Sequence, residues 1–173
     1  MTDYTLEDAK RAWASTYDGL SQDEIDLRVR GLTALVRAVL DEGAISPERF
    51  AKRVDLPVSA ASELFSSLAA MGMQSDEGGN IVGAALTARE TPHRVHLKER
   101  KLYAWCALDT LFIPGLVGET AYVRSTCPVS GSEVSLTVSP RGVDASEPAG
   151  AALSVVLPGV ASTPSSTGPA SPT

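Results

Sequence analysis

The residue types best suited to chemistry lie in one apolar segment, Leu102–Gly118, with the sequence LYAWCALDTLFIPGLVG. Cys106 and Asp109 are three residues apart, and on a helix this spacing makes two side chains neighbours on one face. A thiolate binds soft metals, and a carboxyl group beside it can deliver or collect a proton. The structural alternative is a buried cysteine next to an aspartate that caps the helix or pairs elsewhere. Spacing alone favours this structural alternative.

Apolar neighbours bear on the acidity of this pair. Trp105, Leu108 and Phe112 are expected to form an apolar wall, and such surroundings raise the pKa of a carboxylic acid, which suits a proton donor. The segment predicts a buried helix over Arg100–Phe112, and Pro114 is expected to end that helix within a turn.

The other candidate residues give weaker signals. Cys127 is open to three interpretations: a second thiolate beside Cys106, half of a disulfide, or a cysteine packed at a strand end. His93 and His96 are three apart in a segment predicted to be extended, and in a strand this spacing turns the side chains to opposite faces. A metal ion shared by these two histidines is therefore disfavoured. The sequence has no phosphate loop and no serine nucleophile elbow.

Composition and charge limit the classes of function. The 173 residues suit one domain or two small ones, and 43% hydrophobic residues can bury a core. The net charge of −6 makes nucleic acid and anionic membranes poor partners. The N-terminus has no apolar signal region, and the apolar run Leu102–Val117 is shorter than the roughly 20 residues of a membrane span. Two cysteines in such a chain are typical of free thiols, so we expect a cytoplasmic protein.

Three helices and a hairpin are expected in the first half of the chain. Gly31–Glu42 carries leucine and valine at helical spacing, and Ser46-Pro47 is typical of the N-cap and first position of a second helix. A third helix is expected from about Ser59 to Met71, and Gly78-Gly79-Asn80 is a hairpin turn signal. This order is the plan of a winged-helix module, but the third helix has no Arg or Lys, which disfavours DNA binding and favours a scaffold role.

The second half predicts a small antiparallel sheet. A linker and a strand are expected over 89–97, and further strands over Ala121–Ser125, Val134–Val138 and Ala151–Leu157. The fold class is therefore α+β, a winged-helix-like module followed by a sheet domain whose buried helix carries the site.

The predicted domain limits follow from these elements. They are 1–90 for the helical module, 91–160 for the catalytic core, and 161–173 for a disordered tail of mostly Ser, Thr and Pro.

Several segments resemble one enzyme family, the alkylmercury (organomercurial) lyases. Leu102–Phe112 (LYAWCALDTLF) with the following IPGL resembles the family's catalytic segment, and its WCALDTL core is specific. Order and spacing hold from about residue 30 to residue 158. Three further segments match the family. They are Asn80–Thr91, through the fragments NIVG, LT and RET; Cys127–Pro140, through CP and VSLTVSP; and Glu147–Gly150, through EPAG.

The resemblance implies an enzyme that splits a carbon–mercury bond. Cys106 matches the family's first catalytic cysteine, and Asp109 matches its catalytic aspartate. In the family, two thiolates bind the mercury of R–Hg⁺ and the carboxyl group protonates the leaving carbon, which gives a hydrocarbon and Hg²⁺. The resemblance also implies no organic cofactor and a thiol or a mercuric reductase as acceptor of Hg²⁺. Trp105, and with less support Cys127, are expected to contact the substrate.

The sequence departs from the family pattern at the second catalytic cysteine. In the family that cysteine follows the Leu-Pro that Leu157-Pro158 matches, and no cysteine follows Cys127 here. Three alternatives stay open: a shortened lyase with weakened turnover, Cys127 in place of the missing cysteine, or a mercury-binding protein without turnover. A winged-helix regulator is less favoured because its third helix lacks basic residues.

Overall fold

The computed structural model describes Glu7, Arg11 and residues 14–154 of the chain. The chain divides into two compact units, Met1–Leu20 with Ser154–Thr173, and Ser21–Leu153. In the first unit the described part contains one short 3-10 helix, η1 (Ser15–Tyr17). The tail predicted over 161–173 lies outside the described residues. The elements below all belong to Ser21–Leu153, and the domain boundary predicted at residue 90 stays a prediction.

Helix α2 (Gln22–Glu42) begins well before Gly31, the predicted start. The reason is a capping box at Ser21: its side chain accepts a hydrogen bond from the Glu24 backbone N–H, and its own N–H donates to the Glu24 carboxylate at 2.8 Å. The predicted helix covered only the apolar half of α2. At the other end Gly43 adopts the left-handed conformation, with φ of 82°, and stops the helix.

Helices α3 (Pro47–Val54) and α4 (Val58–Ala70) agree with the sequence prediction. Ser46 caps α3 by accepting a hydrogen bond from the Arg49 backbone N–H, and Pro47 occupies the first turn. The three helices share an aliphatic core in which the rings of Phe50 and Phe65 meet edge to face at 5.3 Å.

The predicted hairpin is present as the antiparallel pair β1 (Gln74–Ser75) and β2 (Ile81–Gly83). Asp76 organises its turn by accepting hydrogen bonds from the backbone N–H groups of Gly78 and Asn80, both at 2.9 Å. A bridge between Ile45 and Ile81 ties the hairpin to the helices. The assignment of these elements to a winged-helix module stays a prediction.

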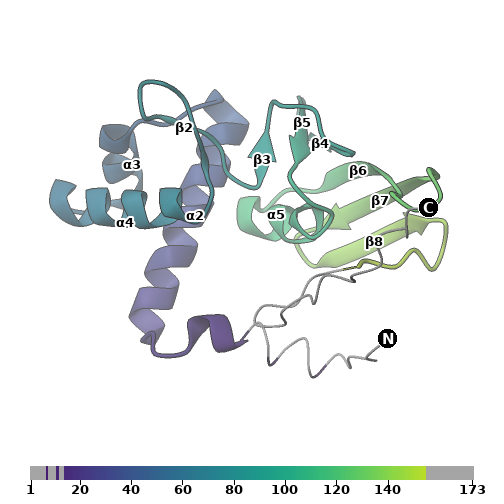
Figure 1. Ribbon diagram of the computed structural model, residues 1–173, viewed down its shortest axis with the longest axis horizontal. Coiled ribbons are helices and arrows are strands. Elements are labelled where there is room, and N and C mark those ends of the chain that lie inside the picture. The colour runs from purple at the N-terminus through teal and green to yellow at the C-terminus, as the bar shows by residue number, and fades with distance from the viewer. Residues whose placement is uncertain (1–6, 8–10, 12–13, 155–173) are drawn as a thin grey trace, which may run out of the picture. The chain divides into compact units, whose positions relative to one another are not determined.

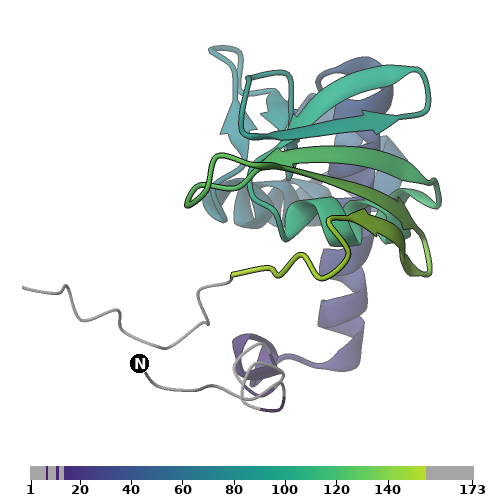
Figure 2. The same cartoon turned by 90° about the vertical axis from the view of Figure 1, so that its right-hand side faces the viewer.

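A six-stranded antiparallel sheet forms the second half, in the order β3-β5-β4-β6-β7-β8 (Figure 1). The α+β class and the two central strand predictions are confirmed. Helix α5 (Asp109–Val117) packs on α2 and on strands β6 to β8 (Figure 2). The strands are β3 (Leu86–Thr87), β4 (His93–Leu97), β5 (Arg100–Ala104), β6 (Ala121–Thr126), β7 (Glu133–Ser139) and β8 (Gly142–Glu147).

The predicted helix over Arg100–Phe112 is wrong. Residues 100–104 form strand β5, in which the buried Leu102 and Ala104 alternate with more exposed neighbours, and this strand pairs with β3 and β4. Pro114 does not end α5 but lies inside it. The helix loses one backbone hydrogen bond there, and Pro114 is buried together with Ile113 and Val117.

The prediction of a strand over Ala151–Leu157 is also wrong for the residues of that segment that the structure describes. Residues 151–154 have no regular structure, and 155–157 lie outside the described residues. The edge strand is β8, which follows β7 directly through the turn at Pro140-Arg141. Most of β8 is exposed, so its sequence lacks the apolar alternation that indicates a strand. No helix among the described residues is long and apolar enough to span a membrane.

Candidate active site

The candidate site lies where strand β5 gives way to helix α5. The Trp105 backbone N–H donates to the Ala85 carbonyl at 3.1 Å, which holds the chain as it leaves the strand. Cys106 is in the following turn, and Asp109 is the first residue of α5. The two residues are therefore neighbours, as the sequence predicted, but through a turn rather than along a helix face.

A backbone hydrogen bond joins the two residues. The Cys106 N–H donates to Oδ2 of Asp109 at 2.8 Å. This link joins the first residue of α5 to the turn that precedes the helix. Thr110 adds a second tie, because its hydroxyl donates to the Ala107 carbonyl at 2.7 Å. The turn that carries the thiol is thereby held on the end of α5.

Asp109 is a buried acid. Asp109 is 9% exposed, and this burial raises the pKa of its carboxyl group above the ordinary value. Hydrogen bonds from the Cys106 backbone and thiol, and the nearby charge of His93, offset part of that rise. The direction agrees with the sequence prediction, and a raised pKa makes the carboxyl group better able to take up a proton and donate it again.

Cys106 combines an exposed position with a protonated thiol. The residue is exposed and forms no disulfide. Partial desolvation of the sulfur raises the pKa of the thiol; backbone N–H groups of Asp109 and Leu108 oppose this rise, and the Asp109 carboxyl group adds to it. The thiol and the carboxyl group share a hydrogen bond, so a proton can pass between them.

His93 is a neighbour of Asp109 that the sequence analysis missed. Its Nδ1 lies 2.9 Å from the Ser125 hydroxyl, on the strand that pairs with β4, and its backbone N–H donates to the Thr91 hydroxyl. Burial lowers the pKa of His93, and the negative charge of Asp109 opposes that change. The sequence did contain a signal for this position: His93 is two residues before the buried Val95, and side chains two apart in a strand share a face, here the core side of β4.

Cys127 is placed in the turn between β6 and β7. Its N–H donates to the Ser132 carbonyl at 2.8 Å, and its carbonyl accepts from Gly131. Hydrogen bonds from the Ser130 hydroxyl and from the Ser130 and Val129 amides lower the pKa of its thiol. Every interaction described for Cys127 is inside this turn, and both cysteines are free. The disulfide interpretation is therefore wrong, and a role for Cys127 in substrate binding stays a prediction.

The expected apolar wall is partly open to solvent. Trp105 and Leu108 are half-buried, and Phe112 is 37% exposed. Contact between Trp105 and a substrate stays a prediction. His93 and His96 face opposite sides of the sheet, as their spacing predicted. Across the described residues, no group of three or more His, Cys, Asp or Glu side chains could hold a metal ion.

Comparison with known proteins shows similarity to one enzyme family. A family model described as alkylmercury lyase matches residues 86–167, which include β3 to β8 and the whole candidate site. Over those residues, the chain is similar to the alkylmercury lyases. An alkylmercury lyase of Pseudomonas putida is 49% identical over 89 residues, 51% of this chain and 42% of that protein. One of Staphylococcus epidermidis is 37% identical over 124 residues, 72% of this chain and 56% of that protein.

The family likeness extends to the fold. The mercury-bound crystal structure of a protein named MerB2 aligns with a TM-score of 0.62 and 22% sequence identity, over 82% of this chain and 68% of that one. At this identity the likeness supports the fold alone. The chain spans about half the length of the curated alkylmercury lyases that it matches.

Proposed function

We propose that this chain cleaves the carbon–mercury bond of organomercurial cations R–Hg⁺ by protonolysis. Cys106 is the mercury ligand and Asp109 is the proton donor. The observation that carries the proposal is the hydrogen-bonded pair of an exposed thiol and a buried carboxyl group with a raised pKa at the start of α5. The similarity to alkylmercury lyases over residues 86–167 supports it.

Capture of the substrate transfers a proton. When the Cys106 sulfur bonds to mercury, the thiol loses its proton, and the ionised Asp109 carboxylate, which accepts the thiol's hydrogen bond, takes it up. The products of this step are a neutral S–Hg–R adduct and a protonated Asp109. No external base is required, because the acceptor is already in hydrogen-bond contact with the donor.

Cleavage returns the same proton to carbon. The soft sulfur donates electron density to mercury, and the Asp109 proton adds to the carbon with the electron pair of the carbon–mercury bond. That bond breaks, R–H leaves, mercury stays on sulfur as S–Hg⁺, and Asp109 is a carboxylate again. A second thiol then removes Hg²⁺, and we propose that an exogenous thiol or a mercuric reductase is the acceptor. We also propose that the reaction uses no cofactor and takes place in the cytoplasm, where thiols stay reduced.

Mercury capture without turnover is the second candidate. Among the described residues, Cys106 is the one thiol in contact with Asp109, since the interactions of Cys127 are within its own turn. A single thiolate suffices to bind R–Hg⁺, whereas bond cleavage gains from a second sulfur donor on the metal. This observation favours retention of the adduct over release of the hydrocarbon.

One assay separates the two candidates. The purified chain is incubated with phenylmercury and excess thiol, and benzene release and bound mercury are measured together for the wild type, Cys106→Ser, and Cys127→Ser as a matched control. Benzene release that Cys106→Ser abolishes supports the lyase. Mercury bound one to one without benzene, and lost in Cys106→Ser, supports capture alone. Mercury binding that survives in Cys106→Ser contradicts both.

A further inference from the structure

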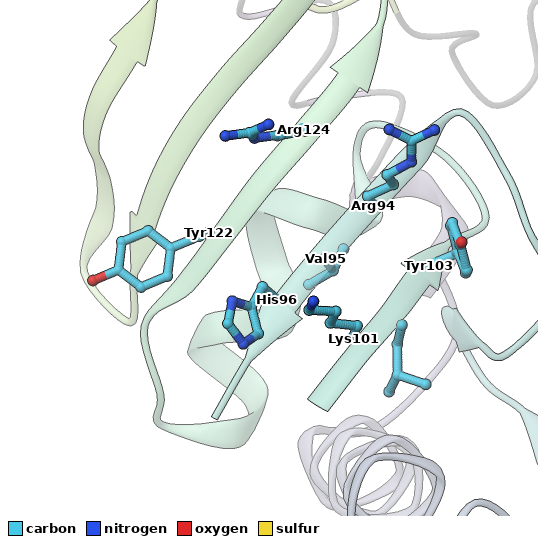
Figure 3. Close-up of a pocket in the computed structure, with 8 residues that line it drawn as sticks. Arg94, Val95, His96, Lys101, Tyr103, Tyr122 and Arg124 are labelled. Carbon is cyan, nitrogen blue, oxygen red and sulfur yellow. The ribbon is translucent and has the colours of Figure 1, made fainter. Parts of the chain in front are cut away.

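The sheet has a second chemically distinct surface, on the side of β4 opposite the half-buried His93. On β4, the side chains of Arg94 and His96 point away from the core, and the neighbouring strands β5 and β6 contribute the residues beside them (Figure 3). The pairing of the strands arranges six residues in two rows, Tyr103–Arg94–Arg124 and Lys101–His96–Tyr122. We call these six residues the basic sheet face.

The charges of this face are unlike those of the chain as a whole. The chain has a net charge of −6, yet the six positions hold two arginines, a lysine and a histidine, and no carboxylate. Arg94 and Arg124 are direct cross-strand partners, an arrangement that costs stability because like charges repel. Their carboxylate contacts are distant: Glu90 is 3.8 Å from Arg94 and Glu133 is 3.8 Å from Arg124. The repulsion is therefore only weakly compensated by the protein.

The face is also hollowed. Its six residues, with Val95 and Leu102 beneath, line a depression of about 570 Å³, a volume in the range of small-molecule sites. Neighbouring strands are about 4.8 Å apart, and the two rows are separated by two residues, or about 7 Å, along each strand. The Arg94–Arg124 pair spans β4 and β6, and the His96–Lys101 pair spans β4 and β5, so their centres are offset by about 7 Å along the strands and about 4.8 Å across them. The two donor groups are thus about 8 to 9 Å apart.

We propose that the basic sheet face binds a compact organic dianion whose two anionic groups are about 8 to 9 Å apart. One group bridges Arg94 and Arg124 and removes their mutual repulsion, and the second accepts hydrogen bonds from His96 and Lys101. Tyr103 and Tyr122, at opposite corners, each add a hydroxyl donor. This site is separate from the chemistry proposed for Cys106 and Asp109.

The surroundings favour a compact ligand over a long polyanion. Glu90 and Glu133 border the face and are largely exposed, and Glu147 continues the row that contains Arg124 and Ser135. A nucleic acid or an acidic peptide long enough to extend beyond the face would be repelled by these carboxylates. Both dicarboxylates and phosphate esters satisfy the proposed spacing, because both present anionic oxygens that pair with guanidinium groups.

The test is a calorimetric titration of the full chain with malonate, succinate, glutarate and adipate, and with inorganic phosphate and a sugar bisphosphate. We expect one-to-one binding that strengthens along the dicarboxylate series toward adipate, because adipate is the longest of the four and comes nearest to the spacing of about 8 to 9 Å. Binding of the bisphosphate but of no dicarboxylate identifies phosphate as the ligand chemistry and leaves the site in place.

Matched variants locate the site. Arg94→Gln and Lys101→Gln are expected to weaken binding by about 10- to 100-fold each, because each removes a charge-assisted hydrogen bond. Arg30→Gln on α2 and Lys52→Gln on α3, both exposed, are the controls. Arg94→Gln relieves a like-charge contact, so its thermal stability should not fall. Equal affinity for malonate and adipate, equal losses in the controls, or no binding of any probe would overturn the proposal.

Discussion

Asp109→Asn tests the chemistry of the candidate site most directly. Asparagine has nearly the same shape as aspartate, and its amide oxygen can still accept the hydrogen bond that the Cys106 N–H donates to Oδ2 at 2.8 Å. The amide has no acidic proton to give to carbon. Loss of a positioned general acid lowers rates by about 10²- to 10⁴-fold, so benzene release should fall by that factor.

The effect of Asp109→Asn on stability should be small at neutral pH. Exchange of a charged for a neutral acceptor costs about 1 kcal/mol at most, and removal of a buried ionisable group offsets part of that cost. A change of about 1 kcal/mol shifts the Tm of a chain of this size by about 2–4 °C. Capture of phenylmercury should persist, because Cys106 retains its sulfur and its place in the turn.

The pH dependence of stability gives an independent check. The folded pKa of Asp109 lies above its unfolded value, so the folded state binds the proton more tightly. The stabilisation from this group is complete below about pH 4 and is lost as the pH rises through the folded pKa. The Tm of the wild type minus that of Asp109→Asn should therefore fall as the pH rises above about 4.

The assay is single-turnover benzene release, with bound mercury and Tm measured on the same samples. A variant that keeps more than about a tenth of the wild-type rate would refute Asp109 as the proton donor. A large loss of Tm together with lost mercury capture would show that Asp109 holds the turn rather than supplies the proton.

Three further predictions follow from other described residues. Iodoacetamide should label Cys127 before Cys106 at neutral pH, because hydrogen bonds lower the pKa of the Cys127 thiol while desolvation raises that of the Cys106 thiol. Mass spectrometry measures the order of labelling, and the reverse order contradicts these two pKa directions. The folded pKa of His93 is below its unfolded value, so the wild type should lose Tm relative to His93→Gln as the pH falls below about 6.5, and parallel Tm curves would refute this. Phe50→Ala should cost about 3–5 kcal/mol in urea unfolding, and the partly exposed Phe112→Ala clearly less.

Local signals in the sequence were sufficient for the elements that they control. Ser46 and Pro47 begin α3 as predicted, because a cap and a restricted φ act within a single turn. The Gly78-Gly79-Asn80 turn was also predictable, since Asp76 bonds to that turn's own backbone. In these cases the physics that decides the structure lies within a few consecutive residues.

Strand β5 and strand β8 depend on partners elsewhere in the chain. The segment Arg100–Phe112 is apolar between Lys101 and Asp109, and such a short run fits a helix or a buried strand equally well. Pairing with β3 and β4 decides for the strand over its first five residues. β8 is an exposed edge strand with no apolar alternation to detect. His93 was missed for the same kind of reason, because its coupling to Asp109 depends on how β4 packs near α5.

The error in the helix boundary changes the chemistry expected of Cys106 and Asp109. On a helix face the Cys106 N–H would bond to the carbonyl of residue 102, and the carboxyl group would be free to turn toward solvent. In the turn, that N–H has no helical acceptor and donates to Asp109 instead. The carboxyl group is then held against the residue that carries the thiol, and the thiol can donate its proton without rearrangement. A strand end followed by a helix start therefore orients the acid toward the sulfur more firmly than the predicted helix would have done.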